Sequence, residues 1–138
     1  MTQRTSPQPA KQAAFKAFEL FNIVVFTVGA KVSTTINVAM QFQDARGQNI
    51  AQIASCYVYL SDNANGSTLT ATAATSNIVV GTNGVVLDTP VTEKEVHCLT
   101  NATGQLDLNI VQTASPQPYY LCVIMPDGSI AVSPLFTF

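Results

Sequence analysis

Apolar and polar side chains alternate along the stretch from residue 32 to residue 43. One face of this alternation is formed by Val32, Thr34, Ile36, Val38, Met40 and Phe42. Successive side chains of a β-strand point to opposite faces, so a period of two is typical of a strand with one face in a core. The pattern predicts such a strand here, followed by a turn at 44–47 where Gly47 can adopt a positive φ.

The rest of the chain repeats short apolar segments separated by turn residues. The expected strands lie at about 22–28, 53–60, 78–81, 85–87, 95–100, 105–112, 119–125 and 130–138. Thr82-Asn83-Gly84 predicts a β-hairpin between the third and fourth of these, and Pro134 places the last strand at an edge or a bulge. Residues 61–76 suit a long loop or a frayed edge strand, and residues 8–20 predict a short helix that begins after Ser6-Pro7.

Strands that follow one another without helices favour antiparallel pairing, because a parallel crossover needs about a dozen residues or more. We therefore expect an all-β fold, an antiparallel β-sandwich of about seven or eight strands. The length of 138 residues suits one domain of this kind. Charged residues make up only 10% of the chain, which excludes a disordered chain, a coiled coil and a generically basic nucleic-acid binder.

Charge is unevenly distributed. Residues 1–31 contain four basic residues and one acidic residue, whereas residues 32–138 contain two basic and seven acidic residues. We therefore divide the chain into a basic and apolar N-terminal arm, 1–31, in helical or extended form, and a sandwich domain, 32–138. The arm either docks on an acidic partner or a neighbouring copy, or is a solvated tail that keeps the protein soluble.

Candidate catalytic and metal-binding groups are few. His97 is the sole histidine, and on a strand its side chain and that of Cys98 point to opposite faces, which prevents a direct Cys–His pair. Glu93 and Glu95 share a face if the strand begins that early, and a solvated acidic face is the simpler interpretation. The turn aspartates Asp44, Asp62 and Asp127 are expected to bond their own backbone rather than calcium. We expect no enzyme activity, no cofactor and no metal.

The three cysteines Cys56, Cys98 and Cys122 form no CxxC pair, so they give no zinc signature and no disulfide framework. The opening residues 1–14 are polar and rich in Pro and Gln, and we expect no secretory signal. The apolar run 20–30 is shorter than the roughly 20 residues that a membrane span needs, so we expect no membrane partner.

Exposed apolar side chains suggest contact with other proteins. Tyr57 and Tyr59 share the strand face away from Cys56, where aromatic side chains often anchor interfaces. They either form such an interface or pack against the chain's own N-terminal segment. The N-terminal segment also holds the densest apolar cluster outside the sandwich, formed by Phe15, Phe18, Phe21, Ile23 and Val25. This cluster either covers a sheet edge of the sandwich domain or reaches a neighbouring subunit.

Two segments carry a resemblance to a known family. The stretch INVAMQFQDARGQNIAQIASCYVYLSD at 36–62 resembles the opening of bacterial immunoglobulin-like domains of the invasin/intimin type, with an alternating strand, a D-x-x-G turn and a second strand. LTNATGQLDLNI at 99–110 is similar to their T-x-x-G segment, which enters an inner strand. The region 78–138 also looks like small immunoglobulin-like structural proteins of tailed bacteriophages, some of which decorate or cement the capsid.

The resemblance implies an immunoglobulin-like sandwich in which Cys56 and Cys122 occupy matching inner positions as a core thiol pair. They are either a cross-sheet disulfide or two small buried hydrophobic side chains, and synthesis in the cytosol favours the second. Tyr120, two residues before Cys122, has the spacing of an immunoglobulin tyrosine corner.

The expected function is that of a non-enzymatic virion structural protein assembled in the host cytoplasm, a capsid decoration or cement protein anchored by its arm. Its partners would be the major capsid protein, other virion proteins and further copies of itself, as an oligomer or as lattice-bound copies, and not nucleic acid. The alternative is a module that binds carbohydrate or a host surface on a phage tail, collar or fibre, through a loop-borne patch with exposed tyrosines and polar amides near Asn63, Asn65 or Asn83. A bacterial adhesin repeat is a third interpretation, which the missing signal disfavours.

Overall fold

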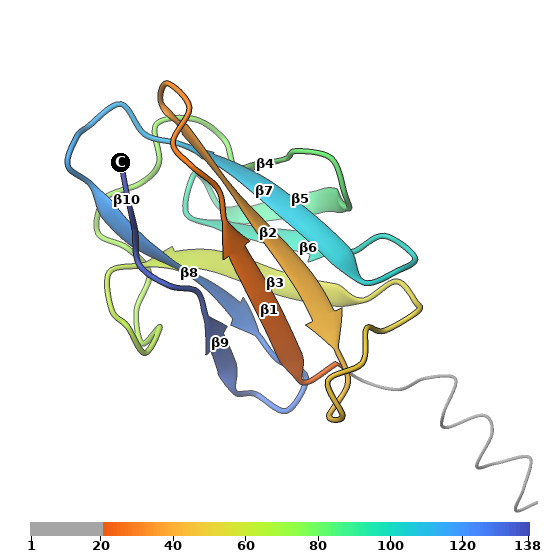
Figure 1. Cartoon of the computed structure of the whole chain (residues 1–138). Helices are drawn as coiled ribbons and strands as arrows, with labels where there is room; N and C mark the ends of the chain where they lie inside the picture. Colours follow the sequence, from red (N-terminus) through yellow and green to blue (C-terminus); the bar gives the residue numbers. More distant parts are fainter. Residues whose placement is uncertain (1–20) are drawn as a thin grey trace, which may run out of the picture.

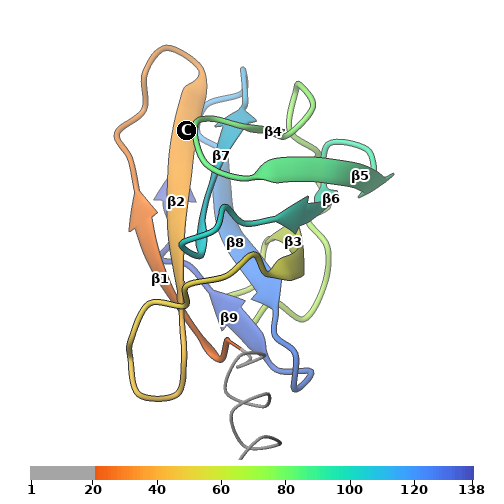
Figure 2. The same cartoon turned by 90° about the vertical axis from the view of Figure 1, so that its right-hand side faces the viewer.

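The computed structural model describes residues 21–138, and these residues form strands and loops without a helix. Ten strands follow one another in two stacked antiparallel sheets (Figures 1 and 2). Their bounds are β1 Ile23–Val28, β2 Thr35–Gln43, β3 Ser55–Ser61, β4 Val79–Val80, β5 Val85–Val91, β6 Glu95–Leu99, β7 Gln105–Val111, β8 Pro118–Ile124, β9 Ile130–Val132 and β10 Phe136–Thr137. The predicted all-β antiparallel sandwich is confirmed. Within the described part of the chain, nothing has the helical length and hydropathy required to cross a membrane.

The four-stranded sheet has the order β1-β2-β7-β4, and the six-stranded sheet has the order β10-β8-β3-β6-β5, with β9 also paired to β8. The first order matches strands A-B-E-D of an immunoglobulin sandwich, and β10-β8-β3 matches G-F-C. The β5–β6 hairpin widens the second sheet beyond β3 and is inserted in the chain between β4 and β7. Strands outnumber the expected seven or eight partly because the predicted strand at 130–138 is divided into β9 and β10 around Pro134.

β2 shows how the alternation in the sequence becomes core and surface. The side chains of Ile36, Val38, Met40 and Phe42 are at most 2% exposed and face the second sheet. The strand begins at Thr35 rather than at Val32, which is 73% exposed. The backbone N–H groups of Val32 and Thr35 each donate to the other residue's carbonyl, which closes the β1–β2 hairpin loop before the strand begins.

The core lies between the sheets and is filled by large side chains from both. Leu108 and Ile110 of β7 face Leu60 of β3 and Leu121 of β8, and all four are fully buried. Burying one such side chain contributes about 1.5–3 kcal/mol relative to leaving it exposed. Tyr119 and Phe138 close one end of this core, with ring centroids 5.9 Å apart.

The predicted hairpin around Thr82-Asn83-Gly84 is wrong. β4 pairs with β7 of the first sheet, whereas β5 pairs with β6 of the second, so the turn connects the two sheets. The buried carboxylate of Asp107 explains this path, because it accepts hydrogen bonds from the backbone N–H groups of Thr82 and Asn83. Gly81 is required beside it, since a Cβ there would lie 2.2 Å from the Asp107 Oδ2 atom.

β1 belongs to the sandwich, so residues 23–28 of the expected arm form a sheet strand. Ile23 and Val25 of the expected apolar cluster therefore lie within the sandwich's own sheet. Phe21 is 5% exposed and packs edge-on against Phe42, with ring centroids 4.6 Å apart. The helix expected at 8–20 and the interface residues Phe15 and Phe18 lie outside the described residues.

Candidate interaction surface

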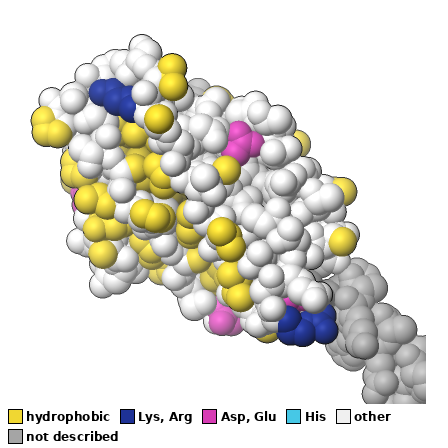
Figure 3. Space-filling model, in the orientation of Figure 1, with side chains coloured by type: hydrophobic (Ala, Val, Ile, Leu, Met, Phe, Trp, Pro, Cys, Tyr) yellow, Lys and Arg dark blue, Asp and Glu magenta, His cyan; other side chains and the backbone are white. Residues whose placement is uncertain are grey.

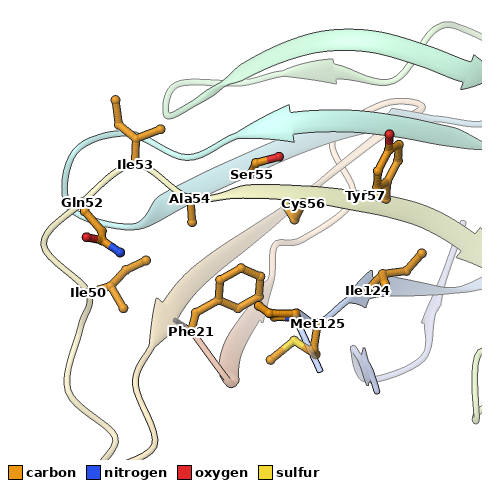
Figure 4. Close-up of a pocket in the computed structure, with 11 residues that line it drawn as sticks. Phe21, Ile50, Gln52, Ile53, Ala54, Ser55, Cys56, Tyr57, Ile124 and Met125 are labelled. Carbon is orange, nitrogen blue, oxygen red and sulfur yellow. The ribbon is translucent and has the colours of Figure 1, made fainter. Parts of the chain in front are cut away.

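A hollow opens where β3 and β8 separate. The two strands pair only from Val58 to Ser61, so the beginning of β3 has no β8 neighbour. The resulting hollow has a volume of about 450 Å³ and is lined mainly by apolar side chains. Figure 4 shows how β3 divides it: Ser55 and Tyr57 point to one side, while Ala54 and Cys56 point toward Phe21 and Met125.

The rim of this hollow is stiffened by Tyr57 and His97. Their rings stack, with centroids 4.4 Å apart and an angle of 14° between the planes. The His97 Nε2 atom is 2.8 Å from the hydroxyl oxygen of Ser55 in a hydrogen bond. Tyr57 is therefore held in one orientation although 42% of it is exposed, which is the property of an interface anchor.

A second hollow, of about 300 Å³, lies on the same face of the six-stranded sheet, bordered by Tyr59, Leu69, Glu95 and Ile130. Ile124 borders both hollows and is paired in register with Ile130. Together these features form a surface that we call the outer apolar face. Its members are 38–59% exposed and are Ile53, Tyr57, Leu69, Ile124 and Ile130.

Tyr59 does not belong to this exposed surface, contrary to expectation, since it is only 6% exposed. Its hydroxyl donates to the carbonyl of Gly66, within the loop that crosses this face after β3. Burial, and in second place the neighbouring Cys122 thiol, raises the pKa of Tyr59 to about 12. Of the two predicted tyrosines, the structure leaves Tyr57 available for contact.

The loop that covers Tyr59 is fixed by its own polar groups. Asp62 accepts hydrogen bonds from the Thr70 hydroxyl at 2.6 Å and from the backbone N–H of Ala71 at 2.9 Å. Gly66 has a φ of +67°, and a Cβ there would lie 3.0 Å from Cys122 Sγ and Tyr59 Oη. Only glycine allows this close approach without displacing the loop.

The predicted pairing of Cys56 with Cys122 is wrong. Cys56 stands directly opposite Cys98 in the β3–β6 register, facing the core, whereas Cys122 stands opposite Tyr59, on the other face of the sheet. The resemblance placed both cysteines inside because it fixed the strands but not their registers, and a register change of one residue reverses the face. All three cysteines are buried free thiols.

Burial also determines the reactivity of the thiols. It raises the pKa of Cys98 to about 12 and that of Cys122 to about 11. The pKa of Cys56 is raised further, by burial first and by the adjacent Cys98 second. Because the thiolate is the reactive form, burial disfavours nucleophilic reaction of all three thiols at neutral pH.

Polar groups on the outer apolar face do not assemble a hydrolytic triad. Ser55 and His97 form the hydrogen bond that a nucleophile and its base require. Across residues 21–138, however, no carboxylate hydrogen-bonds to His97, and Asp88, its register partner on β5, accepts from the backbone N–H of Thr89. The hydrogen bond with Ser55 therefore holds the His97 ring against which Tyr57 stacks.

The remaining acidic candidates have structural roles. Asp44 accepts from the backbone N–H groups of Gln48 and Arg46, which lowers its pKa, and Asp127 accepts from Ser129. Glu93 lies in the β5–β6 turn with a φ of 62°, so it does not share a strand face with Glu95. Among the described residues no group of three metal-ligating side chains gathers.

Ile124, Ile130 and Ile53 are the members of the face that the sequence did not reveal as surface residues. The segment 119–125 is apolar on both faces, which predicted a central strand, and β8 does lie between β3 and the β9 and β10 strands. The sequence did carry one signal for these surface residues. The segment 119–125 is apolar on both faces, and one face of such a strand stays exposed where the neighbouring strand no longer pairs with it. Ile23 and Val25 are exposed at 36% and 45%, on the other sheet.

Comparison with known proteins does not extend this description, since no family model, curated protein or solved structure matches the chain.

Proposed function

We propose that this chain is a non-enzymatic structural protein of a virion, which binds the capsid lattice or another component of the particle through protein contacts. The observation that supports a contact function is the outer apolar face, where the exposed, oriented Tyr57 lines a hollow of about 450 Å³ and Ile124 joins this hollow to a second one of about 300 Å³. Contiguous exposed apolar surface on a soluble protein marks interaction sites. The virion setting is supported by the sequence resemblance to tailed-phage structural proteins.

The chemistry of the face favours a protein partner. Tyr57 and Ile124 offer large apolar area, and hollows beside them can accept side chains from a partner. Each contact would be modest, and a repeating lattice would supply the high effective concentration that holds many copies.

The carbohydrate alternative draws less support from the described residues. The hollow that contains Asn83, about 210 Å³, is bordered by Gln41, Gln105 and Asp107 and has no aromatic side chain. Its amides bond internally: Gln41 donates to the carbonyl of Thr103, and Asn83 and Gln105 accept from Asn101. Sugars are generally bound by free polar groups beside an aromatic platform.

The test is co-sedimentation of the purified chain with empty capsids of the phage that encodes it. Tyr57→Ala should weaken binding about tenfold or more, because truncating a central aromatic anchor costs about 2 kcal/mol. Val79→Ala is the matched control, since Val79 is 48% exposed on the other sheet and should leave binding unchanged. Equal binding of wild type and Tyr57→Ala would contradict the proposed surface, and glycan-array binding without capsid binding would favour the alternative.

A further inference from the structure

The sheet edges of residues 21–138 differ in how they are protected. β4 and β10 are two residues long and β9 is three, too short to pair with much of another chain. β5 is longer, but it contains Pro90 and two register shifts against β6. β1 pairs with β2 over six consecutive residues without a shift, and its other side pairs with none of the described strands.

The register shows which backbone groups this free side presents. The N–H of Gly29 donates to the carbonyl of Asn37 at 2.8 Å, in continuation of the β1–β2 register. Because hydrogen-bonded and non-hydrogen-bonded pairs alternate in an antiparallel ladder, the odd-numbered residues of β1 bond to β2. The N–H and C=O groups of Val24, Phe26 and Val28 therefore point away from the sheet.

The side chains of β1 add apolar surface without charge. Its sequence, IVVFTV, contains no charged residue, proline or glycine. Val24, Phe26 and Val28 are half-buried against the core, while Ile23 and Val25 are exposed on the outer face of the sheet. Figure 3 shows hydrophobic side chains gathered on the side of the molecule where β1, β9 and β10 lie.

An exposed, regular, apolar edge strand is a template for another strand, and native proteins usually block such edges with charges, proline or bulges. We propose that β1 is the site where a second copy of this chain pairs, antiparallel, with its own β1. This inference goes beyond the proposed function and does not depend on a virion setting.

Three features of the strand favour a second copy as the occupant. β1 carries no charge, so two copies meet without like-charge repulsion. A two-fold axis at Phe26 places Val24 opposite Val28 of the partner subunit, which pairs every outward N–H and C=O group. Residues 13–20, AAFKAFEL, are mostly strong helix formers, so the sequence that leads into β1 favours a helix over a strand.

One strand pair is a small interface, below the roughly 1,200 Å² of a stable complex. The dimer should therefore be weak and dependent on concentration, and it should strengthen where copies are already held close together.

Cysteine cross-linking tests the register directly. In the proposed dimer Val25 faces Thr27 of the partner subunit in a non-hydrogen-bonded pair, where Cα atoms lie about 4.5 Å apart, within disulfide range. Val25→Cys and Thr27→Cys proteins are mixed at high concentration with oxidised glutathione, which accepts the two electrons and two protons released. The mixture should give a disulfide-linked dimer on a non-reducing gel, at least tenfold more than either variant alone.

The matched control mixes Val25→Cys with Val79→Cys, which is similarly exposed on β4 and should not cross-link. A second measurement, sedimentation velocity, should show that Val25→Lys weakens association of the chain at least tenfold, because a lysine on an edge strand opposes pairing. The proposal is overturned if the wild type stays monomeric at all concentrations, if the control mixture cross-links equally well, or if Val25→Cys alone cross-links better than the mixture.

Discussion

The two long edge strands, β1 and β5, differ in how well they are protected against pairing with another strand. β5 interrupts its ladder with two register shifts, carries Asp88 and Pro90, and ends in a turn where Glu93 has a positive φ. β1 keeps an unbroken register and an uncharged, apolar sequence. The comparison shows that the sandwich can block an edge with ordinary local devices, so the open edge at β1 is a property of its particular sequence.

The anchoring of the two edges differs as well. The connection into β5 depends on a polar network, since Asp107 accepts from Thr82, Asn83 and the side-chain amide of Asn37. β1 depends on its ladder to β2 and on the packing of half-buried apolar side chains. Polar and apolar substitutions should therefore affect the two edges selectively.

The largest effect is expected from Asp107→Ala, which leaves the N–H groups of Thr82 and Asn83 without their carboxylate. The free energy of unfolding should fall by about 3 kcal/mol, because hydrogen bonds to a charged group are strong and their buried donors would lose their partner. Hydrogen exchange should rise at β5 amides and stay unchanged at β1. The control, Asp88→Ala, removes an exposed carboxylate and should change stability by less than about 0.5 kcal/mol in urea unfolding.

An intermediate effect is expected from a matched pair of prolines in β1. Val25→Pro removes an N–H that bonds to β2 and should cost about 1–3 kcal/mol, because the carbonyl of Gln41 loses its donor. Val24→Pro removes an outward N–H, so the ladder to β2 survives while the free edge becomes blocked. Thermal unfolding distinguishes the two, and equal destabilisation would show that the assigned directions of these N–H groups are wrong.

The smallest effect is expected from Pro90→Val on β5. Pro90 is exposed, and its replacement should alter the free energy of unfolding by less than about 0.5 kcal/mol. It should not make this edge associate, because the two register shifts remain. Self-association of the variant in sedimentation velocity, beyond that of the wild type, would mean that the proline alone protects the edge.

The sequence was sufficient to locate strands in which apolar and polar residues alternate and the apolar face is buried in the core. β2, β3 and β7 lie close to their predicted places because one face of each carries apolar residues at alternate positions, and the opposite sheet buries that face. The sequence was a poorer guide to which strands pair with each other. The Asn83-Gly84 signal indicated a local hairpin, but the turn is held by Asp107, a residue far along the chain whose partners no local pattern reveals.

The candidate surface was predictable in part for the same reason. The face of Tyr57 followed from alternation within one strand, whereas the burial of Tyr59 depends on the loop after β3, which has no periodic pattern. The position of Cys122 depends on the β3–β8 register, which no local signal fixes. Contacts between distant segments decided each of these outcomes.

The three enclosed thiols have a consequence for handling and for environment. Each sulfur is buried, and burial disfavours its ionisation at neutral pH. Alkylating reagents and dissolved oxygen should therefore react slowly with the cysteines of the folded protein. Cys56 and Cys98 face each other across the β3–β6 ladder as free thiols. Burial holds both sulfurs in the protonated form at neutral pH, which slows their exchange with disulfide reagents.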